Sequence, residues 1–207
     1  MPQFSNAIKV SLFIIALARL GTGDCVAAKT MIVDAAKPIV GTDEHGHVFP
    51  GACVPFGMVQ LSPNTRKKGW DASGGYHYSD QTILGFSHNH MSGTGAADMG
   101  NILLLPGIGP ITAPLGRDGS GLRFSHQDET VSPGYYRVFF PQEKITVELT
   151  ASQRCGFHRY HFPATEAAHV IIDLRHGLGD RRGTKILRGN IQVESDRVVI
   201  NCWQEAE

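Results

Sequence analysis

The segment Ile145-Thr-Val-Glu-Leu-Thr150 alternates strictly between apolar and polar residues. Successive side chains of a β-strand point to opposite faces of a sheet, so Ile145, Val147 and Leu149 would share one face. In a helix the same three residues would be spread around the axis, because a helix repeats every 3.6 residues. The pattern therefore predicts a strand with one buried face and one polar face.

Similar apolar and aromatic runs surround this strand at short intervals. Turn signals separate them, among them Ser132-Pro-Gly134 and Gly177-Leu-Gly179. Strands that recur every 8–12 residues or so, without a helical pattern between them, indicate an antiparallel sandwich or barrel. We therefore predict an all-β fold, an antiparallel β-sandwich. The other predicted strands cover residues 58–61, 101–105, 135–140, 157–162, 169–174, 185–187, 190–193 and 197–200.

The first half of the chain differs in composition from this strand-rich half. Residues 41–121 contain 16 glycines in 81 positions, almost three times the average frequency of about 7%. Such a segment consists mainly of turns and irregular backbone around a few short strands. The candidate metal-binding, sugar-binding and catalytic residues lie in this segment.

The overall composition excludes two classes of protein. The chain has 207 residues, in which 19 Lys and Arg balance 19 Asp and Glu. A neutral chain lacks the basic excess that nucleic-acid binding requires, so no nucleic-acid partner is expected. No apolar stretch reaches 18 residues, so we expect no membrane span. With 42% hydrophobic residues, the chain is not disordered by composition.

Residues 1–28 have the features of an export signal. Residues 10–20 are apolar, and Val26-Ala27-Ala28 is a small-residue cleavage pattern. A buried N-terminal helix is the alternative, which Arg19 favours and Gly21 opposes. We predict cleavage after Ala28, which makes the mature chain secreted or periplasmic.

Cleavage would remove Cys25 and leave three cysteines. Cys53, Cys155 and Cys202 are widely spaced and odd in number. They form no disulfide framework and no CxxC metal motif, although one bridge remains possible.

Two histidine pairs, His45-x-His47 and His88-x-His90, have the same spacing. On extended backbone, residues i and i+2 share a face, so each pair could present two imidazoles to one zinc or copper ion. The alternatives are contact with a ligand or a domain interface, and hydrogen bonds to the backbone. The pattern alone assigns no metal to these residues.

Trp70-Asp71 and Tyr76-His77-Tyr78 place aromatic rings near a carboxylate. Sugars are recognised by this combination, because a ring stacks on the C–H face while carboxylates and imidazoles bind the hydroxyls. Tyr76 and Tyr78 also fit a strand with one of them in the core. A glycosidase needs two carboxylates across the scissile bond, and no spacing in the sequence singles out such a pair. Ser92 lacks the G-x-S-x-G turn of a nucleophile.

Five blocks of the sequence together resemble glycoside hydrolase family 92, a family of exported α-mannosidases. The similarity runs in order from about residue 33 to about residue 200. One departure from the family pattern is Asp43-Glu44, which stands where small residues often precede the histidine-rich turn, and another is the ending after Ile200, where a further strand is expected. The five blocks are residues 40–63 (VGTDEHGHVFPGACVPFGMVQLSP), 75–80 (GYHYSD), 85–95 (GFSHNHMSGTG), 132–136 (SPGYY) and 156–160 (GFHRY).

The resemblance implies an N-terminal β-sandwich joined to a much larger (α/α)6 barrel. It implies inverting hydrolysis of mannose-containing glycans with Ca²⁺, the ion and the catalytic acid and base belonging mainly to the barrel. We therefore expect residues 29–207 to be a truncated sandwich domain with no catalytic residue and no metal ligand of its own. The residues that the resemblance places at the sugar or at the contact between the domains are His47, Trp70, Asp71, His88 and His90.

Two functions from different classes remain open. One is the N-terminal domain of an α-mannosidase, inactive without its barrel. The other is an exported sandwich that binds mannosides by itself, or a truncated product without function.

Overall fold

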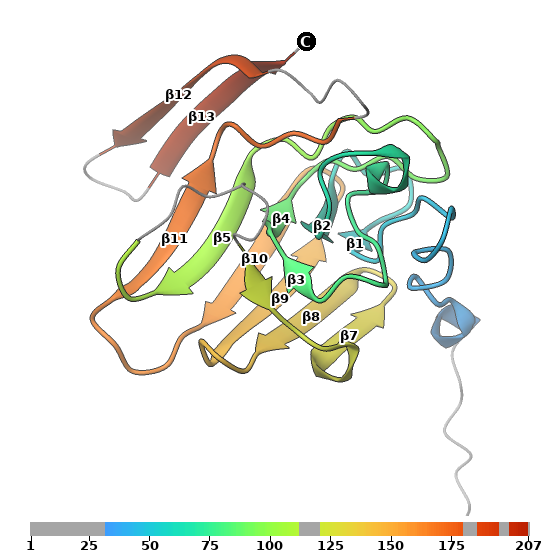
Figure 1. Cartoon of the computed structure of the whole chain (residues 1–207), viewed down its shortest axis with the longest axis horizontal. Helices are drawn as coiled ribbons and strands as arrows, with labels where there is room; N and C mark the ends of the chain where they lie inside the picture. The colour runs from blue at the N-terminus through green and yellow to red at the C-terminus, as the bar shows by residue number, and fades with distance from the viewer. Residues whose placement is uncertain (1–31, 112–120, 180–185, 195–198, 207) are drawn as a thin grey trace, which may run out of the picture. The chain divides into compact units, whose positions relative to one another are not determined.

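The computed structural model describes residues 32–111, 121–179, 186–194 and 199–206 (Figure 1). In these residues the chain forms β-strands and three short 3-10 helices but no α-helix. Every pair of strands is antiparallel. The predicted all-β antiparallel fold is thus confirmed. The predicted export signal lies outside the described residues.

One layer of the fold is a five-stranded sheet that combines both halves of the chain. Its order is β1-β2-β4-β5-β11, and Figure 1 shows β5 and β11 side by side although they are far apart in sequence. The strands are β1 (Ala52–Cys53), β2 (Gln60–Asn64), β4 (Gly85–Ser87), β5 (Leu103–Ile108) and β11 (Ala168–Asp173).

The other layer is a four-stranded meander in which each strand pairs with its neighbour in sequence. Between β7 and β8, Pro133 and Gly134 form the turn, and Gly134 has φ +74°, as the second central residue of a type II turn requires. The strands are β7 (Glu129–Ser132), β8 (Tyr135–Phe140), β9 (Ile145–Ala151) and β10 (Gly156–His161).

Two small two-stranded sheets complete the description. The first pairs β3 (Thr82–Ile83) with β6 (Leu122–Arg123), and the second pairs β12 (Ile186–Glu194) with β13 (Val199–Ala206). The three 3-10 helices are η1 (Ile32–Ala35), η2 (Trp70–Ala72) and η3 (His126–Asp128).

The alternating segment behaves as its pattern predicts. In β9, Ile145, Val147 and Leu149 are buried, whereas the polar residues between them are not. The register of β8 against β9 places the buried Val138 opposite Val147 and the buried Phe140 opposite Ile145. The apolar faces of the two strands therefore form one continuous surface.

The core lies between the two layers. Phe86 of the five-stranded sheet is fully buried, with its ring centroid 6.4 Å from Tyr136 and 6.5 Å from Phe140 of the meander. Leu61 of β2 belongs to the same buried cluster. Burying one such side chain stabilises the fold by about 1.5–3 kcal/mol, so this shared core joins the two sheets as a sandwich.

Strand boundaries shift where the sequence pattern is weakest. The first predicted strand, 58–61, is found at 60–64, because Met58 is exposed and Met58 N bonds instead to the carbonyl of Gln153. The predicted strands 185–187 and 190–193 form one strand, β12, whose register shifts between Ile186 and Arg188. β12 and β13 pair as one hairpin and extend beyond the predicted ends.

Cys53 and Cys155 are free thiols, so no bridge joins these two. The structure describes the backbone of Cys202 but not its side chain. Among the described residues, no helix is long and apolar enough to cross a membrane.

Candidate functional site

The first half of the site is the tight turn at residues 41–47, which precedes β1. Gly46 lies so close to the carbonyl oxygen of Gly41 that an added Cβ would be 1.9 Å from it. Glu44 and His47 adopt left-handed φ angles of +48° and +53°, which non-glycine residues seldom adopt. The side chain of Asp43 stabilises the turn by accepting a hydrogen bond from Glu44 N at 2.9 Å.

The turn is also anchored from outside. His77 Nε2 lies 3.1 Å from the carbonyl oxygen of Glu44, so the ring can donate a hydrogen bond to it. The left-handed Glu44 is thus held in place through its carbonyl oxygen.

The second half of the site is η2, which carries Trp70 and Asp71. Gly69 precedes it with φ +91°, and the hydroxyl of Ser73 donates to the carbonyl of Trp70 at 2.6 Å. Gly95 packs against the indole, because a Cβ there would be 2.4 Å from Trp70 Nε1. These contacts fix where the Trp70 ring and the Asp71 carboxylate point.

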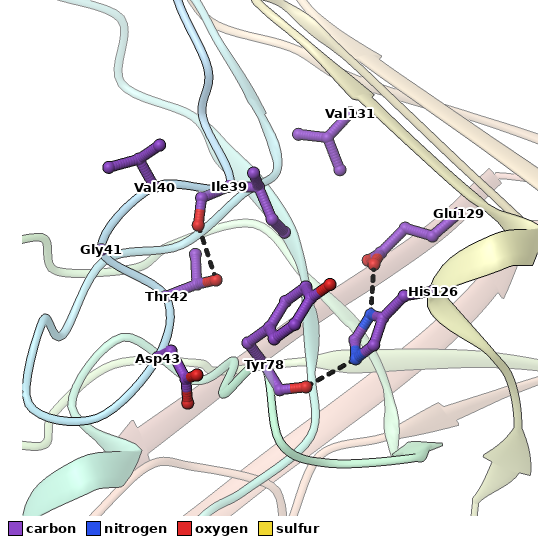
Figure 2. A pocket seen from close by; sticks show the side chains of 9 residues that line it. All are labelled: Ile39, Val40, Gly41, Thr42, Asp43, Tyr78, His126, Glu129 and Val131. Atoms are coloured by element: carbon purple, nitrogen blue, oxygen red, sulfur yellow. Dashed lines mark hydrogen bonds and ion pairs between the residues drawn. The ribbon is translucent and has the colours of Figure 1, made fainter.

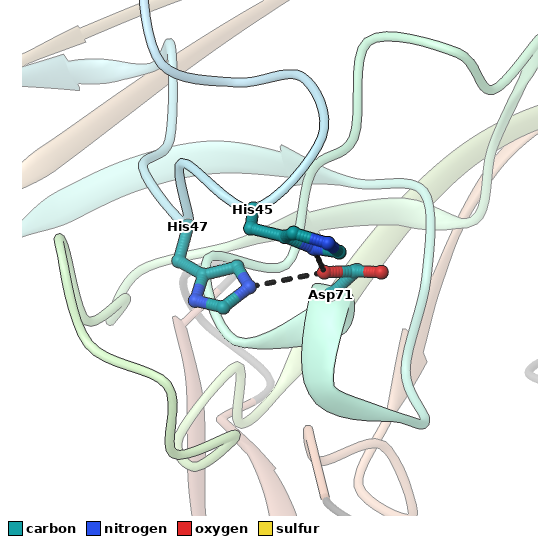
Figure 3. Close-up of side chains that lie close together, drawn as sticks. All are labelled: His45, His47 and Asp71. Atoms are coloured by element: carbon teal, nitrogen blue, oxygen red, sulfur yellow. Dashed lines mark hydrogen bonds and ion pairs between the residues drawn. The ribbon is translucent and has the colours of Figure 1, made fainter.

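Both halves meet at one carboxylate oxygen (Figure 3). Asp71 Oδ1 lies 2.7 Å from His45 Nδ1 and 3.1 Å from His47 Nε2. The Trp70 ring has its centroid 4.7 Å from each imidazole. We call His45, His47, Trp70 and Asp71 the turn cluster.

The turn cluster combines exposed and buried groups. His47 is 7% exposed, whereas Trp70 is 55% exposed. The hydrogen bonds from His45 and then from His47 hold the pKa of Asp71 below its usual value. Asp71 is therefore a carboxylate that stays ionised and accepts hydrogen bonds.

His88 is placed in a different network, away from Asp71. Its Nε2 lies 3.0 Å from His158 Nε2, and His158 Nδ1 lies 2.7 Å from the hydroxyl of Tyr160. Burial lowers the pKa of His88 and lowers the pKa of His158 to about 3. Both rings are therefore neutral near pH 7, and one donates to the other.

His90 lies inside the domain. It is 4% exposed, and its Nδ1 donates to the carbonyl of Gln60 at 2.8 Å. Its Nε2 lies 3.1 Å from Ser87 Oγ and contacts Asn64 Oδ1. Burial lowers the pKa of His90 to about 4, so the ring is neutral and holds the backbone of β2.

The structure thus brings together three of the five residues expected at the sugar, namely His47, Trp70 and Asp71. It places His88 and His90 in separate hydrogen-bond networks. His45, which the sequence marked only as half of a pair, joins the three. Its signal was the His-x-His spacing, but only the left-handed turn shows that the pair converges on Asp71.

A pocket of about 520 Å³ was not predicted from the sequence (Figure 2). On its wall the rings of Tyr78 and His126 stack with centroids 3.9 Å apart and planes 9° from parallel. His126 Nε2 donates to the carbonyl of Tyr78 at 2.5 Å, and Nδ1 lies 2.9 Å from Glu129 Oε2. The nine lining residues are Ile39, Val40, Gly41, Thr42, Asp43, Tyr78, His126, Glu129 and Val131.

On the wall of this pocket, the side chain of Glu129 is only 3% exposed, and its carboxylate accepts several hydrogen bonds. The Tyr76 hydroxyl donates to Oε2 at 2.9 Å, and the Tyr136 hydroxyl donates to Oε1 at 2.7 Å. Burial and the nearby Glu129 charge raise the pKa of both tyrosines. Hydrogen bonds of this kind are what a buried carboxylate requires, so Glu129 links strand β7 to the core.

The metal-ligating groups of the described residues do not resemble a calcium site. His45, His47 and Asp71 offer donor atoms within 4.8 Å of one another, but two of the three are nitrogens. Ca²⁺ takes six to eight oxygen ligands. The turn cluster therefore does not fit a calcium ion, which the sequence resemblance assigns mainly to the barrel.

The fold and the site define a β-sandwich domain whose loops present one aromatic ring, two imidazoles and one carboxylate. The family model described as the glycosyl hydrolase family 92 N-terminal domain matches residues 35–205. The chain belongs to this family, as its N-terminal domain.

Solved structures of family members have the same fold. A family GH92 α-mannosidase from Bacteroides thetaiotaomicron, in complex with mannoimidazole, is 35% identical with a TM-score of 0.78, over 84% of this chain and 23% of that chain. The family GH92 inverting mannosidase of B. thetaiotaomicron VPI-5482 is 29% identical with a TM-score of 0.58, over 68% of this chain and 19% of that chain.

A curated relative is a glycosidase by name. It is named "Uncharacterized secreted glycosidase", comes from Arthroderma benhamiae, and is 32% identical over 152 residues, which are 66% of this chain. The chain spans 19% of the length of that relative. It also spans less than a quarter of either mannosidase chain above.

Proposed function

We propose that this chain is the N-terminal sandwich domain of an exported inverting α-mannosidase, and that the turn cluster binds a mannose unit of its glycan substrate. The observation that carries the proposal is the convergence of Trp70, Asp71 and two imidazoles at one surface position. The structural relatives, which are mannosidases by name, support the choice of sugar.

The chemistry of the cluster suits a sugar ring. The half-exposed Trp70 offers an apolar face on which the C–H face of a pyranose can stack. The Asp71 carboxylate accepts hydrogen bonds from sugar hydroxyls. His47 is buried, and we assign it the task of holding Asp71 at the correct angle. His45 lies on the exposed side of the same carboxylate.

No proton transfer is assigned to these residues. Inversion needs an acid and a base about 6.5–9.5 Å apart, and a carboxyl whose pKa is lowered, as in Asp71, is poorly suited to act as the acid. We assign the acid, the base and the Ca²⁺ ion to the (α/α)6 barrel that the family resemblance implies. The barrel would be the partner of this domain.

Export is part of the proposal. The apolar residues 10–20 and the Val26-Ala27-Ala28 pattern support it, as does the word "secreted" in the name of the curated relative. Sequencing the N-terminus of the exported protein should give Lys29 as the first residue. A mature product that keeps Met1 would contradict it.

Binding is tested on the full chain with methyl α-mannoside as the probe, followed by NMR line shifts. We expect weak binding that each of two variants reduces by at least about tenfold. Trp70→Ala removes the ring on which the sugar stacks, and Asp71→Ala removes the charged acceptor of its hydroxyls. Phe56→Ala is the matched control, since this aromatic side chain is fully exposed elsewhere. Equal losses in all three variants, or no loss in any, would contradict the assignment.

Catalysis is tested separately with an aryl α-mannoside. We expect no turnover by the purified 207-residue chain, because the proposal places both catalytic carboxyls in the barrel. Turnover that rises in proportion to the concentration of this chain would refute that part.

A further inference from the structure

The turn cluster contains three side chains of types that commonly coordinate metal ions. His45 Nδ1, His47 Nε2 and Asp71 Oδ1 lie within 4.8 Å of one another, and they approach from two separate segments of the chain. Figure 3 shows both imidazole rings directed at the same carboxylate. Two imidazoles and one carboxylate, with open positions remaining, are a recurrent donor set for transition metals.

The donor atoms select the class of ion. Imidazole nitrogen suits zinc, copper, iron and nickel, whereas calcium and magnesium prefer oxygen ligands. A site with two nitrogens and one oxygen therefore favours a divalent first-row transition ion over the calcium that the family resemblance assigns to the barrel.

The distances are close to those that such an ion imposes. With bonds of about 2.0–2.1 Å in a tetrahedral site, two ligand atoms lie about 3.3 Å apart. The observed separations from Asp71 Oδ1 are 2.7 Å to His45 Nδ1 and 3.1 Å to His47 Nε2. An ion would require the oxygen to move away from both nitrogens, and these nitrogens lie no more than 4.8 Å apart. The side chain of His45 is 65% exposed, so its ring can contribute to this separation.

The backbone holds the ligands in place before any ion binds. Gly46 leaves no space for a side chain, and His47 is fixed in the left-handed region. The Trp70 ring packs against both imidazoles, at an interplanar angle of 37° to His45 and edge-on at 80° to His47. The partial exposure of Asp71 and His45 leaves one side of the cluster open to solvent. This open side is where a fourth ligand, such as water, would bind.

We propose that His45, His47 and Asp71 bind one divalent transition-metal ion, with Zn²⁺ as the probe, and leave at least one coordination position open. The proposal does not depend on sugar binding. Zinc affinity is measured without sugar, and mannoside binding is measured in the presence of a chelator, so either can fail alone.

The chain contains a matched control. On β10, His161 Nε2 lies 2.9 Å from Glu148 Oε2, and the side chain of His161 is 57% exposed. Like His45 and Asp71, this pair joins an exposed histidine to a carboxylate, but Arg159 donates hydrogen bonds to both oxygens of Glu148. A cation already bonds there, so His161→Ala should not affect a zinc site.

The experiment uses the full, untagged chain after removal of metals, and titrates Zn²⁺ against a chromogenic chelator. We expect one ion per chain, unaffected by millimolar Ca²⁺. His45→Ala and Asp71→Ala should each weaken binding by at least about tenfold, because loss of even an outer-sphere partner typically costs 10–100-fold. His161→Ala should bind zinc as the unmodified chain does.

Two further readouts make the result decisive. Co²⁺ in place of zinc should give visible absorption that His45→Ala removes, and circular dichroism should show that the variants keep their strands. A chain that binds no zinc overturns the proposal. Zinc binding that survives in both His45→Ala and Asp71→Ala would overturn it as well.

Discussion

The pairs His45/His47 and His88/His90 have the same spacing in sequence but different environments in the fold. His45 and His47 converge on one ionised carboxylate at the surface. His88 and His90 face different partners inside the sandwich, and burial lowers the pKa of both. The first pair is therefore available to a ligand, whereas the second contributes to the stability of the domain.

The backbone explains the difference. Gly46 and the left-handed His47 form a turn that directs both rings to one point. His88 and His90 follow β4 directly, and the hydrogen bonds of their rings are made with β2 and β10. The first pair forms a site because η2 packs beside it and supplies Asp71, which both imidazoles contact.

The largest effect that we expect from the buried histidines is a loss of folding stability in acid. In the unfolded chain a histidine has a pKa near 6.5, whereas burial lowers the pKa of His90 to about 4 and that of His158 to about 3. The unfolded chain therefore binds more protons as the pH falls below 6.5. Stability is fully present above that pH and is lost progressively toward pH 4 and below.

At pH 5 each of the two histidines should reduce the free energy of unfolding by about 2 kcal/mol, since one pKa unit corresponds to 1.36 kcal/mol. Urea denaturation at pH 7 and pH 5 measures the difference. In His158→Gln the loss of stability between pH 7 and pH 5 should be smaller by about 2 kcal/mol, while the other buried histidines, His88, His90 and His176, still contribute. A curve that is equally steep in this variant would show that other groups cause the acid loss.

The next largest effect is expected for His90→Ala. It removes the partner of the Gln60 carbonyl and of the buried side chains of Asn64 and Ser87. Leaving buried polar groups unpaired costs roughly 1–3 kcal/mol each, so we expect a loss of about 3 kcal/mol. His45→Ala, which alters the exposed pair, should change stability by less than about 0.5 kcal/mol. Similar losses in both variants would remove the distinction between the pairs.

Gly46→Ala tests the turn that makes the first pair converge. A Cβ would lie 1.9 Å from the carbonyl oxygen of Gly41, so the turn must open, at a cost of about 2 kcal/mol. Mannoside binding should disappear in this variant. Gly109→Ala is a control, because an added Cβ there would have no heavy atom within 4 Å, although its φ of +79° also carries strain. Retained binding in Gly46→Ala would contradict the role of the turn.

The smallest effect on stability is expected for Asp71→Asn. Ion pairs at the surface contribute little to stability, so the midpoint of urea denaturation should stay nearly unchanged. Mannoside binding should nevertheless weaken. Denaturation and binding measured on the same sample separate the two outcomes, and a large loss of stability would show that Asp71 has a structural role.

The sandwich could be predicted from the sequence because its signals are local. The alternation of Ile145, Val147 and Leu149 and the Pro133-Gly134 turn each specify a strand or a hairpin without reference to distant residues. The predicted boundaries of β2 were wrong, because Met58 is apolar but exposed. The strand begins later, since the backbone N–H of Met58 bonds to a distant residue, Gln153.

The site could be predicted only in part for the opposite reason. Trp70-Asp71 and the histidine spacing are visible in the sequence, but the approach of residue 71 to residues 45 and 47 depends on left-handed backbone at Glu44 and His47. Neither position is a glycine, so the sequence gives no sign of this left-handed backbone. The burial of His90 and its contact with β2 likewise arise from long-range packing.

The order in which the chain folds follows from the pairing of β5 with β11. The whole meander β7–β10 lies between these two strands in sequence. Hairpins between neighbouring strands close quickly, whereas a pairing across a long loop has a larger entropic cost and forms slowly. We therefore expect the meander to assemble early and the sheet that carries the turn cluster to be completed late. The ligand-binding surface would then be among the last parts of the domain to form, after most of the core is already buried.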